Sequence, residues 1–319
     1  MKCGLIVSIV SIVLLLAGFT QADQPPAVTA ALQSTLRVEK KDGTLCSSAL
    51  LVSEDGYTLT KASEVRKTED HRFVLPDGSL TPVREVERDS QLDLLLLRCE
   101  KTTGLKAAHL EESKSLSMGQ WLLSPRDGGR EIRAGVVSAK RRSIPSAGSA
   151  IGIQMDLGKL DKGVRIKAII PDSPAEAAGL QPNDVVLSIA GEPIDKNQGV
   201  RDLIGRRSPG DEVEILYRRE GRESKCLVRV ASRAHIESYL SDDDYANGGV
   251  SLRADRFHDV LQHDVPLGPA DMGSVLMNLQ GQAIGINIAR ADRVTTFALP
   301  TEAFWPQVKK WIEKDRAAR

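Results

Sequence analysis

The sequence has no net charge and few aromatic residues. Its 319 residues include 43 Lys and Arg against 43 Asp and Glu, and Phe, Trp and Tyr make up only 4%. Because nucleic-acid binding needs a basic surface, this balance argues against a nucleic-acid partner. The sequence also lacks a Walker loop, a dinucleotide-binding glycine pattern and the Cys/His spacing of zinc sites, so neither a cofactor nor a metal is expected. Glycine (26) and proline (15) are plentiful, which favours strands and turns around cores of Val, Ile and Leu.

A single long apolar run near the start of the chain has the features of a targeting signal. Residues 5–19 are almost continuously hydrophobic, Lys2 precedes them, and residues 20–22 (Thr-Gln-Ala) offer the small residues that a signal peptidase reads. The run is short for a membrane span, so we expect residues 1–22 to be a secretory signal peptide. This predicts export across the inner membrane, to the periplasm or the exterior. An uncleaved N-terminal anchor is the alternative.

Cysteines are too few for a disulfide framework. Removal of the signal peptide leaves Cys46, Cys99 and Cys226. An odd number permits one bridge at most, and we interpret all three as small buried hydrophobic residues, with Cys46–Cys99 as the one pair to consider. The cores must therefore be held together by packing.

Short strands follow one another in the first third of the chain. Apolar segments alternate with turn signals such as Glu54-Asp55-Gly56 and Asp77-Gly78, and residues 93–97 (Asp-Leu-Leu-Leu-Leu) have the pattern of a strand buried on both faces. Six such strands between residues 33 and 99 predict a closed β-barrel. A second set of strands begins at residue 121 and stops after residue 139.

Residues 150–230 follow a different pattern, in which strands alternate with two helices. One helix is expected at residues 173–179, and the other carries Val200, Leu203 and Ile204 on one face. The change of pattern indicates a separate α+β domain.

Three motifs give this segment a resemblance to the PDZ domain. Residues 151–153 (Ile-Gly-Ile) match the hydrophobic-Gly-hydrophobic loop that binds a carboxylate. Residues 179–186 match Gly-Leu-x-Pro-Gly-Asp-x-Ile with Asn183 in place of the second glycine, and residues 189–194 match Ile/Val-Asn-Gly-x-x-Val. The resemblance implies a groove that accepts a peptide as an added strand. The alternative is a groove filled by the protein's own tail or loops. The expected peptide-binding residues are Ile151, Gly152, Ile153, Val200 and Ile204.

Strand patterns resume after the PDZ-like segment and end in a helix from about Thr301. Together with the N-terminal strands, they are similar to HtrA-type trypsin-like serine proteases. Residues 53–60 match the family's Ser-x-Asp-Gly-Tyr-Ile-Leu-Thr, residues 93–97 its Asp-Leu-Ala-Leu-Leu, and residues 135–139 its Gly-Ile-Val-Ser-Ala. The last two strands of the family match residues 285–287 and 297–300.

The resemblance implies a mainly β fold, a trypsin-like double β-barrel with a PDZ-like α+β domain inserted in the second barrel. Such an insertion is tolerated at an exposed turn when the ends of the inserted domain lie close together. The predicted division is a signal peptide (1–22), the first barrel (30–110), the start of the second barrel (111–146), the PDZ-like domain (147–233), the remainder of the second barrel (234–300) and a C-terminal helix (301–319).

Catalysis in the HtrA family requires a serine nucleophile, a histidine base and an aspartate that orients the histidine. The family's motifs put Ser63 at the histidine position, Asp93 at the aspartate position and Met272 at the serine position. A thioether has no proton to lose and forms no acyl-enzyme, and a serine does not accept a proton near neutral pH. Ala270 replaces the glycine that helps to shape the oxyanion hole. The sequence therefore predicts a pseudoprotease without an intact catalytic triad.

Three other groups of residues imitate reactive sites. Ser274 lies two residues from the nucleophile position, but on a predicted strand that points it elsewhere. His109 is expected to be a solvated surface residue. His258, His263 and Asp264 suggest a metal cluster, but their spacing on a strand puts the two histidines on opposite faces.

Two functions remain. The favoured one is a secreted, peptide-binding pseudoprotease that reads C-termini or unfolded segments in envelope protein quality control, as a partner of active HtrA-type proteases. The alternative is an active serine endopeptidase with a non-standard site. HtrA-like proteins are often trimeric, so the resemblance also implies a homo-oligomer.

Overall fold

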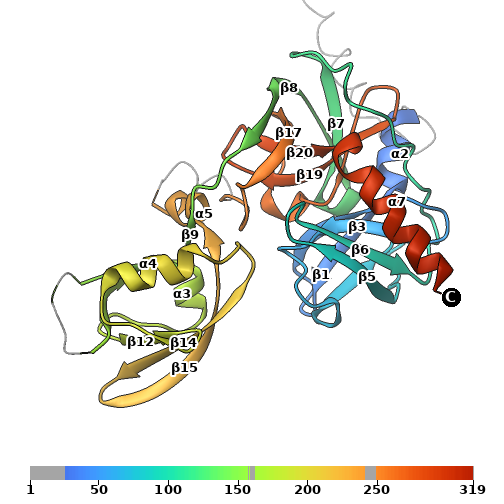
Figure 1. Ribbon diagram of the computed structural model, residues 1–319. Helices are drawn as coiled ribbons and strands as arrows, with labels where there is room; N and C mark the ends of the chain where they lie inside the picture. Colours follow the sequence, from blue (N-terminus) through green and yellow to red (C-terminus); the bar gives the residue numbers. More distant parts are fainter. Residues whose placement is uncertain (1–25, 157, 159–161, 241–248, 319) are drawn as a thin grey trace, which may run out of the picture.

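The computed structural model describes residues 26–156, 158, 162–240 and 249–318. The predicted signal peptide, residues 1–22, lies outside these ranges. No helix within them has the length and apolar character needed to cross a bilayer. Figure 1 shows two adjacent β structures and a third unit beside them, which the chain enters after β8 and leaves before β17.

The first β structure is a six-stranded antiparallel sheet in the order β4-β1-β2-β3-β6-β5. Its strands are rich in Leu and Val, and β6 has apolar residues on both faces, which is why both faces of the sheet are covered. The strands are β1 (Thr35–Lys40), β2 (Leu45–Leu51), β3 (Tyr57–Lys61), β4 (His71–Val74), β5 (Val83–Asp89) and β6 (Leu94–Cys99).

The prediction of a closed first barrel is wrong in one respect, because the edge strands β4 and β5 do not pair with each other. β4 has only four residues, and the turn that follows folds back on it through Thr81 N–H, which donates to Phe73 O at 2.9 Å. Pro82 precedes β5 and has no N–H to continue a ladder. The sheet therefore curls toward closure without completing it.

The second β structure is a closed barrel in the order β17-β20-β19-β18-β7-β8. β8 precedes the PDZ-like segment and β17 follows it, yet the two are paired, with Phe257 opposite Ile144. This pairing confirms the predicted fold class, including the insertion in the second barrel. The strands are β7 (Trp121–Arg126), β8 (Glu131–Ile144), β17 (Phe257–His263), β18 (Val275–Met277), β19 (Ala283–Arg290) and β20 (Thr296–Pro300).

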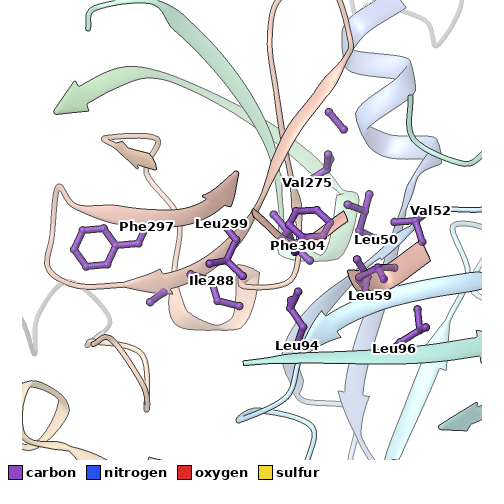
Figure 2. Close-up of a cluster of buried hydrophobic side chains, with 14 of the residues drawn as sticks. Leu50, Val52, Leu59, Leu94, Leu96, Val275, Ile288, Phe297, Leu299 and Phe304 are labelled. Atoms are coloured by element: carbon purple, nitrogen blue, oxygen red, sulfur yellow. The ribbon is translucent and has the colours of Figure 1, made fainter. Parts of the chain in front are cut away.

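The largest apolar core lies where the two β structures meet. Leu59 and Leu96 of the first sheet share one cluster with Ile288 and Leu299 of the barrel and with Phe304 of the C-terminal helix α7 (Thr301–Ala317) (Figure 2). Each such side chain contributes about 1.5–3 kcal/mol through burial. This core makes the two β structures one folding unit.

Helix α7 lies over the first sheet with its predicted apolar face inward (Figure 1). Near its end Asp315 accepts a hydrogen bond from Tyr57 Oη at 2.8 Å and pairs with Arg84 at 2.7 Å. A second helix, α2 (Pro26–Gln33), precedes the first strand and was not predicted; it has no acidic residue in its first turn and no basic residue in its last, so the sequence signals of a helix are weak there.

The inserted unit has a sheet in the order β10-β11-β12-β14-β15 and, within its described residues, three helices. Ser173 caps α3 by accepting a hydrogen bond from Glu176 N–H, and α4 buries Val200, Leu203 and Ile204, as predicted. Its elements are β9 (Ser149–Ala150), β10 (Ile153–Met155), β11 (Val164–Ile169), α3 (Pro174–Ala177), β12 (Val185–Ile189), β13 (Glu192–Pro193), α4 (Asn197–Gly205), β14 (Glu212–Arg219), β15 (Arg222–Arg229), β16 (Ala231–Ser232) and α5 (Arg233–Ser238).

All three described cysteines are free, so the Cys46–Cys99 pair that the sequence left open is not formed in this structure. The Cys46 thiol lies 3.2 Å from Val38 O, and burial raises the pKa of Cys46 to about 12. Cys99 is buried, whereas Cys46 and Cys226 are only partly so.

Candidate functional site

Two of the three predicted triad positions lie together. Asp93 directly precedes β6 and Ser63 follows β3, its paired neighbour. Ser63 donates twice to the Asp93 carboxylate, from its backbone N–H to Oδ1 at 2.7 Å and from its hydroxyl to Oδ2 at 2.9 Å. The serine hydroxyl therefore serves as a donor to a carboxylate that it helps to hold.

Asp93 is only 2% exposed and lies among buried cations that the sequence did not reveal. Burial raises the pKa of Asp93, and the positive charges of Lys61 and Arg253 oppose that shift. Lys61 Nζ lies 3.9 Å from Asp93 Oδ2 and donates to Arg253 O at 3.1 Å. These groups lock the carboxylate into a polar network at the place where a histidine would be oriented.

Met272 is fully buried and takes no part in that network. Its side chain packs in the apolar cluster of the second barrel with Leu122, Leu276 and Ile284. Its carbonyl oxygen accepts hydrogen bonds from Ser48 N–H and the Ser47 hydroxyl, both at 2.8 Å. The residue at the predicted nucleophile position thus supports the packing between the two β structures.

The backbone around Ala270 forms a tight 3-10 turn, η4 (Pro269–Asp271). Within the turn Met272 N–H points back to Pro269 O at 3.3 Å, and Asp271 N–H to Gly268 O at 3.0 Å. An oxyanion hole needs such donors aimed outward, at the oxygen of a tetrahedral intermediate. Here the N–H groups of Asp271 and Met272 donate to carbonyl oxygens of the same loop.

A loop of the PDZ-like unit covers Ser63. It joins α4 to β14, and a Cβ placed on its Gly210 would lie 3.2 Å from Ser63 Cβ. Glu212 at the end of the loop forms an ion pair with Arg66 of the first β structure. A cavity of about 390 Å³ remains at this contact, lined by Ser63 and Asp93 on one side and by Gly210 of the loop on the other.

The other histidines and serines are placed as follows. Ser274 is fully buried, and its hydroxyl accepts a hydrogen bond from Asn287 Nδ2 at 2.9 Å. His263 is fully buried too and lies 2.8 Å from the same amide, at Oδ1, so Asn287 stands between the histidine and the serine. Burial lowers the pKa of His263 to about 4. His109 and His258 are exposed on the surface.

The structure brings all five predicted peptide-binding residues to one groove. Ile151, Gly152 and Ile153 form one side of a cavity of about 350 Å³, and Val200 and Ile204 of α4 form the other. β10 stands at the edge of its sheet, with β11 as its only strand neighbour in the described part of the chain. The groove therefore has an apolar floor and an unpaired strand edge, as strand addition requires.

The loop before β10 has an unusual backbone geometry. Gly152 has φ +87°, and a Cβ there would lie 2.2 Å from Ser173 Cβ, so only glycine fits. Among the described residues, no acceptor is found for the N–H groups of Ile151 and Gly152. Adjacent free N–H groups of this kind form a concave site for a carboxylate.

Comparison with known proteins agrees with this geometry. Residues 47–164 match the trypsin-like peptidase domain, and residues 149–230 match the PDZ domain. The chain therefore combines a trypsin-like peptidase domain with a PDZ domain. The peptidase match ends at residue 164, inside the start of the PDZ match, although β17 to β20 complete the barrel beyond it.

Among curated proteins, the chain is similar to DegP-like serine endoproteases. A "Probable periplasmic serine endoprotease DegP-like" of Ectopseudomonas mendocina (strain ymp) is 24% identical over 354 residues, covering 79% of this chain and 73% of the relative. The protein of the same name from Halomonas elongata is 25% identical over 264 residues, covering 57% and 56%. The protein is thus a homologue of the DegP/HtrA serine proteases, as its motifs predicted, and it spans little more than half the length of the second relative.

Solved structures with similarity include the "HtrA-type protease AlgW with tripeptide", at 19% identity and TM-score 0.32, covering 65% of this chain and 96% of that one. A serine endoprotease from Yersinia pestis matches at 17% identity and TM-score 0.31, with the same coverage.

Proposed function

We propose that this DegP/HtrA homologue is a peptide-binding protein without proteolytic activity. The observation that carries the proposal is the arrangement at the triad positions, where Ser63 donates to Asp93 and the Met272 side chain lies inside the barrel core. Acyl transfer needs a hydroxyl or thiol beside a proton acceptor. Met272 has neither group, and Ser63, whose hydroxyl donates to Asp93, stands at the histidine position and leaves no imidazole there to take a proton from a nucleophile.

The functional site of the molecule is then the PDZ groove. A peptide adds a strand beside β10, its carboxylate meets the N–H groups of Ile151 and Gly152, and its last side chain enters the apolar cavity against Val200 and Ile204. The ligands are C-termini or unfolded segments of proteins.

The setting we propose is the periplasm, since the DegP-like relatives carry that location in their names. There the protein would take part in envelope protein quality control beside active HtrA-type proteases, as a homo-oligomer. Residues 1–22 would be the cleaved signal peptide.

Proteolysis is tested by incubating the purified protein with unfolded casein and a fluorophosphonate probe, with an active HtrA-type protease as positive control. We expect neither cleavage nor labelling, because no activated nucleophile stands at the triad positions. Cleavage or labelling that disappears on Ser274→Ala would overturn the proposal in favour of an endopeptidase with a non-standard site.

Binding is tested by fluorescence anisotropy with peptides that end in an apolar residue. Ile153→Asp puts a charge on the free edge of the groove and should abolish binding. Leu227→Asp, on an exposed position of β15 in the same domain, is the matched control and should leave binding intact. Equal binding by both variants would remove the groove from the proposal.

A further inference from the structure

A second cavity, of about 570 Å³, lies between the PDZ domain and the first β structure. The first β structure contributes Lys40, at the end of β1, and Lys67, which lies between β3 and β4. The PDZ domain contributes Arg229, at the end of β15, and the turn η4 contributes Ala270. None of the predicted peptide-binding residues lines this cavity. Its volume is typical of a small-molecule site, about 300–1,000 Å³.

Two arginines at this domain contact share one carboxylate. Glu212 lies directly opposite Arg229 in the β14–β15 pair, so the two side chains leave the sheet on the same face as close neighbours. The Glu212 carboxylate nevertheless pairs with Arg66 of the first β structure. Burial lowers the pKa of Arg66, and the positive charge of Arg229 lowers it further. Arg229 therefore adds a positive charge beside an ion pair that is already neutral.

The Arg229 guanidinium has buried donors without acceptors. Its Nε and Nη2 are both buried, and no hydrogen-bond partner for either is found within the described residues. A buried charged group that lacks a hydrogen-bond acceptor is costly, so folded proteins retain few of them. Because Arg229 also lines the cavity, a small rotation of its side chain presents these donors to an anion bound there.

The acidic residues on the cavity wall do not supply that anion. Each of them already pairs with another cation: Glu64 with Lys61, Asp70 with Lys41 and Glu212 with Arg66. Lys40, Lys67 and Arg229 have no ion-pair partner among the residues that the structure describes. Three unpaired cations from two domains thus line one cavity.

We propose that this cavity binds a small anion that carries a phosphate group, held by Arg229 of the PDZ domain and by Lys40 and Lys67 of the first β structure. A guanidinium offers paired donors to two phosphate oxygens, and the lysine ammonium groups add point charges. A phosphate group carries up to two negative charges on three acceptor oxygens, so it matches three cations better than a single carboxylate does. The bound anion joins the two domains through their charges. This site goes beyond the proposed peptide binding and does not depend on it.

The test is isothermal titration calorimetry of the purified protein with inorganic phosphate, at an ionic strength held constant with sodium chloride. We expect saturable binding with a dissociation constant of about 1 mM or below. Acetate, which has one charge and two oxygens, should bind at least about tenfold more weakly, because it forms fewer charge-assisted hydrogen bonds.

Arg229→Gln should weaken phosphate binding by at least about tenfold, because it removes the paired charged donors. Arg222→Gln, the matched control, removes the same charge from the exposed start of β15 and should leave the dissociation constant unchanged. In phosphate-free buffer the melting temperature of Arg229→Gln should be no lower than that of the unmodified protein, since the substitution removes an unpaired buried charge. A purely structural arginine would show the opposite: a lower melting temperature and unchanged phosphate binding.

Lys67→Gln keeps the inference testable if Arg229→Gln does not fold. The Lys67 side chain is exposed, so its loss should leave the fold intact and weaken phosphate binding by at least about threefold. The inference is wrong if phosphate shows no saturable binding, if acetate binds as tightly, or if Arg229→Gln or Lys67→Gln binds phosphate as tightly as Arg222→Gln. The peptide-binding assays do not involve this cavity, so the proposed function stands in each of these cases.

Discussion

The cleft at the triad positions and the groove of the PDZ domain depend on different parts of the chain. The cleft needs particular side chains, and those at Ser63 and Met272 cannot perform acyl transfer. The groove needs a backbone conformation, namely a positive φ at Gly152 and an unpaired edge on β10. Side-chain chemistry is therefore lost by single substitutions, whereas a backbone site persists as long as the fold does.

The substituted positions in the cleft have become parts of the structure. Asp93 now accepts two hydrogen bonds from Ser63 and balances the buried charge of Lys61. Met272 fills the barrel core. The cleft should therefore respond to mutation through stability, and the groove through binding.

The largest expected effect comes from Met272→Ser. Removing the buried thioether leaves a cavity and places a hydroxyl among apolar side chains, so the free energy of unfolding should fall by about 4 kcal/mol without any gain of hydrolysis. Met118→Ser, at a side chain that is 61% exposed, is the matched control and should change it by less than about 0.5 kcal/mol. Urea unfolding followed by tryptophan fluorescence measures both; equal stabilities would mean that Met272 is not a core residue.

A smaller loss of stability, accompanied by loss of binding, is expected for Gly152→Ala. The new Cβ would overlap Ser173 and the residue would be held at φ +87°, which together should destabilise the PDZ domain by about 3 kcal/mol and abolish peptide binding. Gly205→Ala, near the end of α4 with open space around it, is the control that should bind normally. Calorimetry and anisotropy report the two effects, and normal binding by Gly152→Ala would show that the loop does not form the site.

Local patterns were enough to predict much of this molecule from its sequence. The apolar faces of α4 and α7 follow from helical spacing, and the expected groove residues follow from the resemblance of residues 151–153 to the carboxylate-binding loop of PDZ domains. What the sequence could not predict depends on contacts between distant segments. Lys61 meets Arg253 across the whole PDZ insertion, and the loop with Gly210 reaches Ser63 from another domain. No periodicity or propensity encodes such contacts.

The smallest expected effect is on the pH dependence of the free energy of unfolding, and it tests whether His263 is a structural histidine or a catalytic one. Its pKa is lowered to about 4 in the fold, against 6.5 for an unperturbed histidine, so the unfolded chain binds a proton first as the pH falls. The stabilising contribution of neutral His263 is complete above pH 6.5 and is lost as the pH falls toward 4, by about 2 kcal/mol between pH 7 and 4.5. The variant His263→Gln keeps a polar side chain near Asn287 but cannot titrate. Its free energy of unfolding should therefore fall by about 2 kcal/mol less than that of the unmodified protein between pH 7 and 4.5, as measured by urea unfolding at each pH. An identical pH dependence in both proteins would mean that His263 titrates in contact with water. That result would reopen the case for Ser274, which Asn287 links to it, as the nucleophile of a non-standard site.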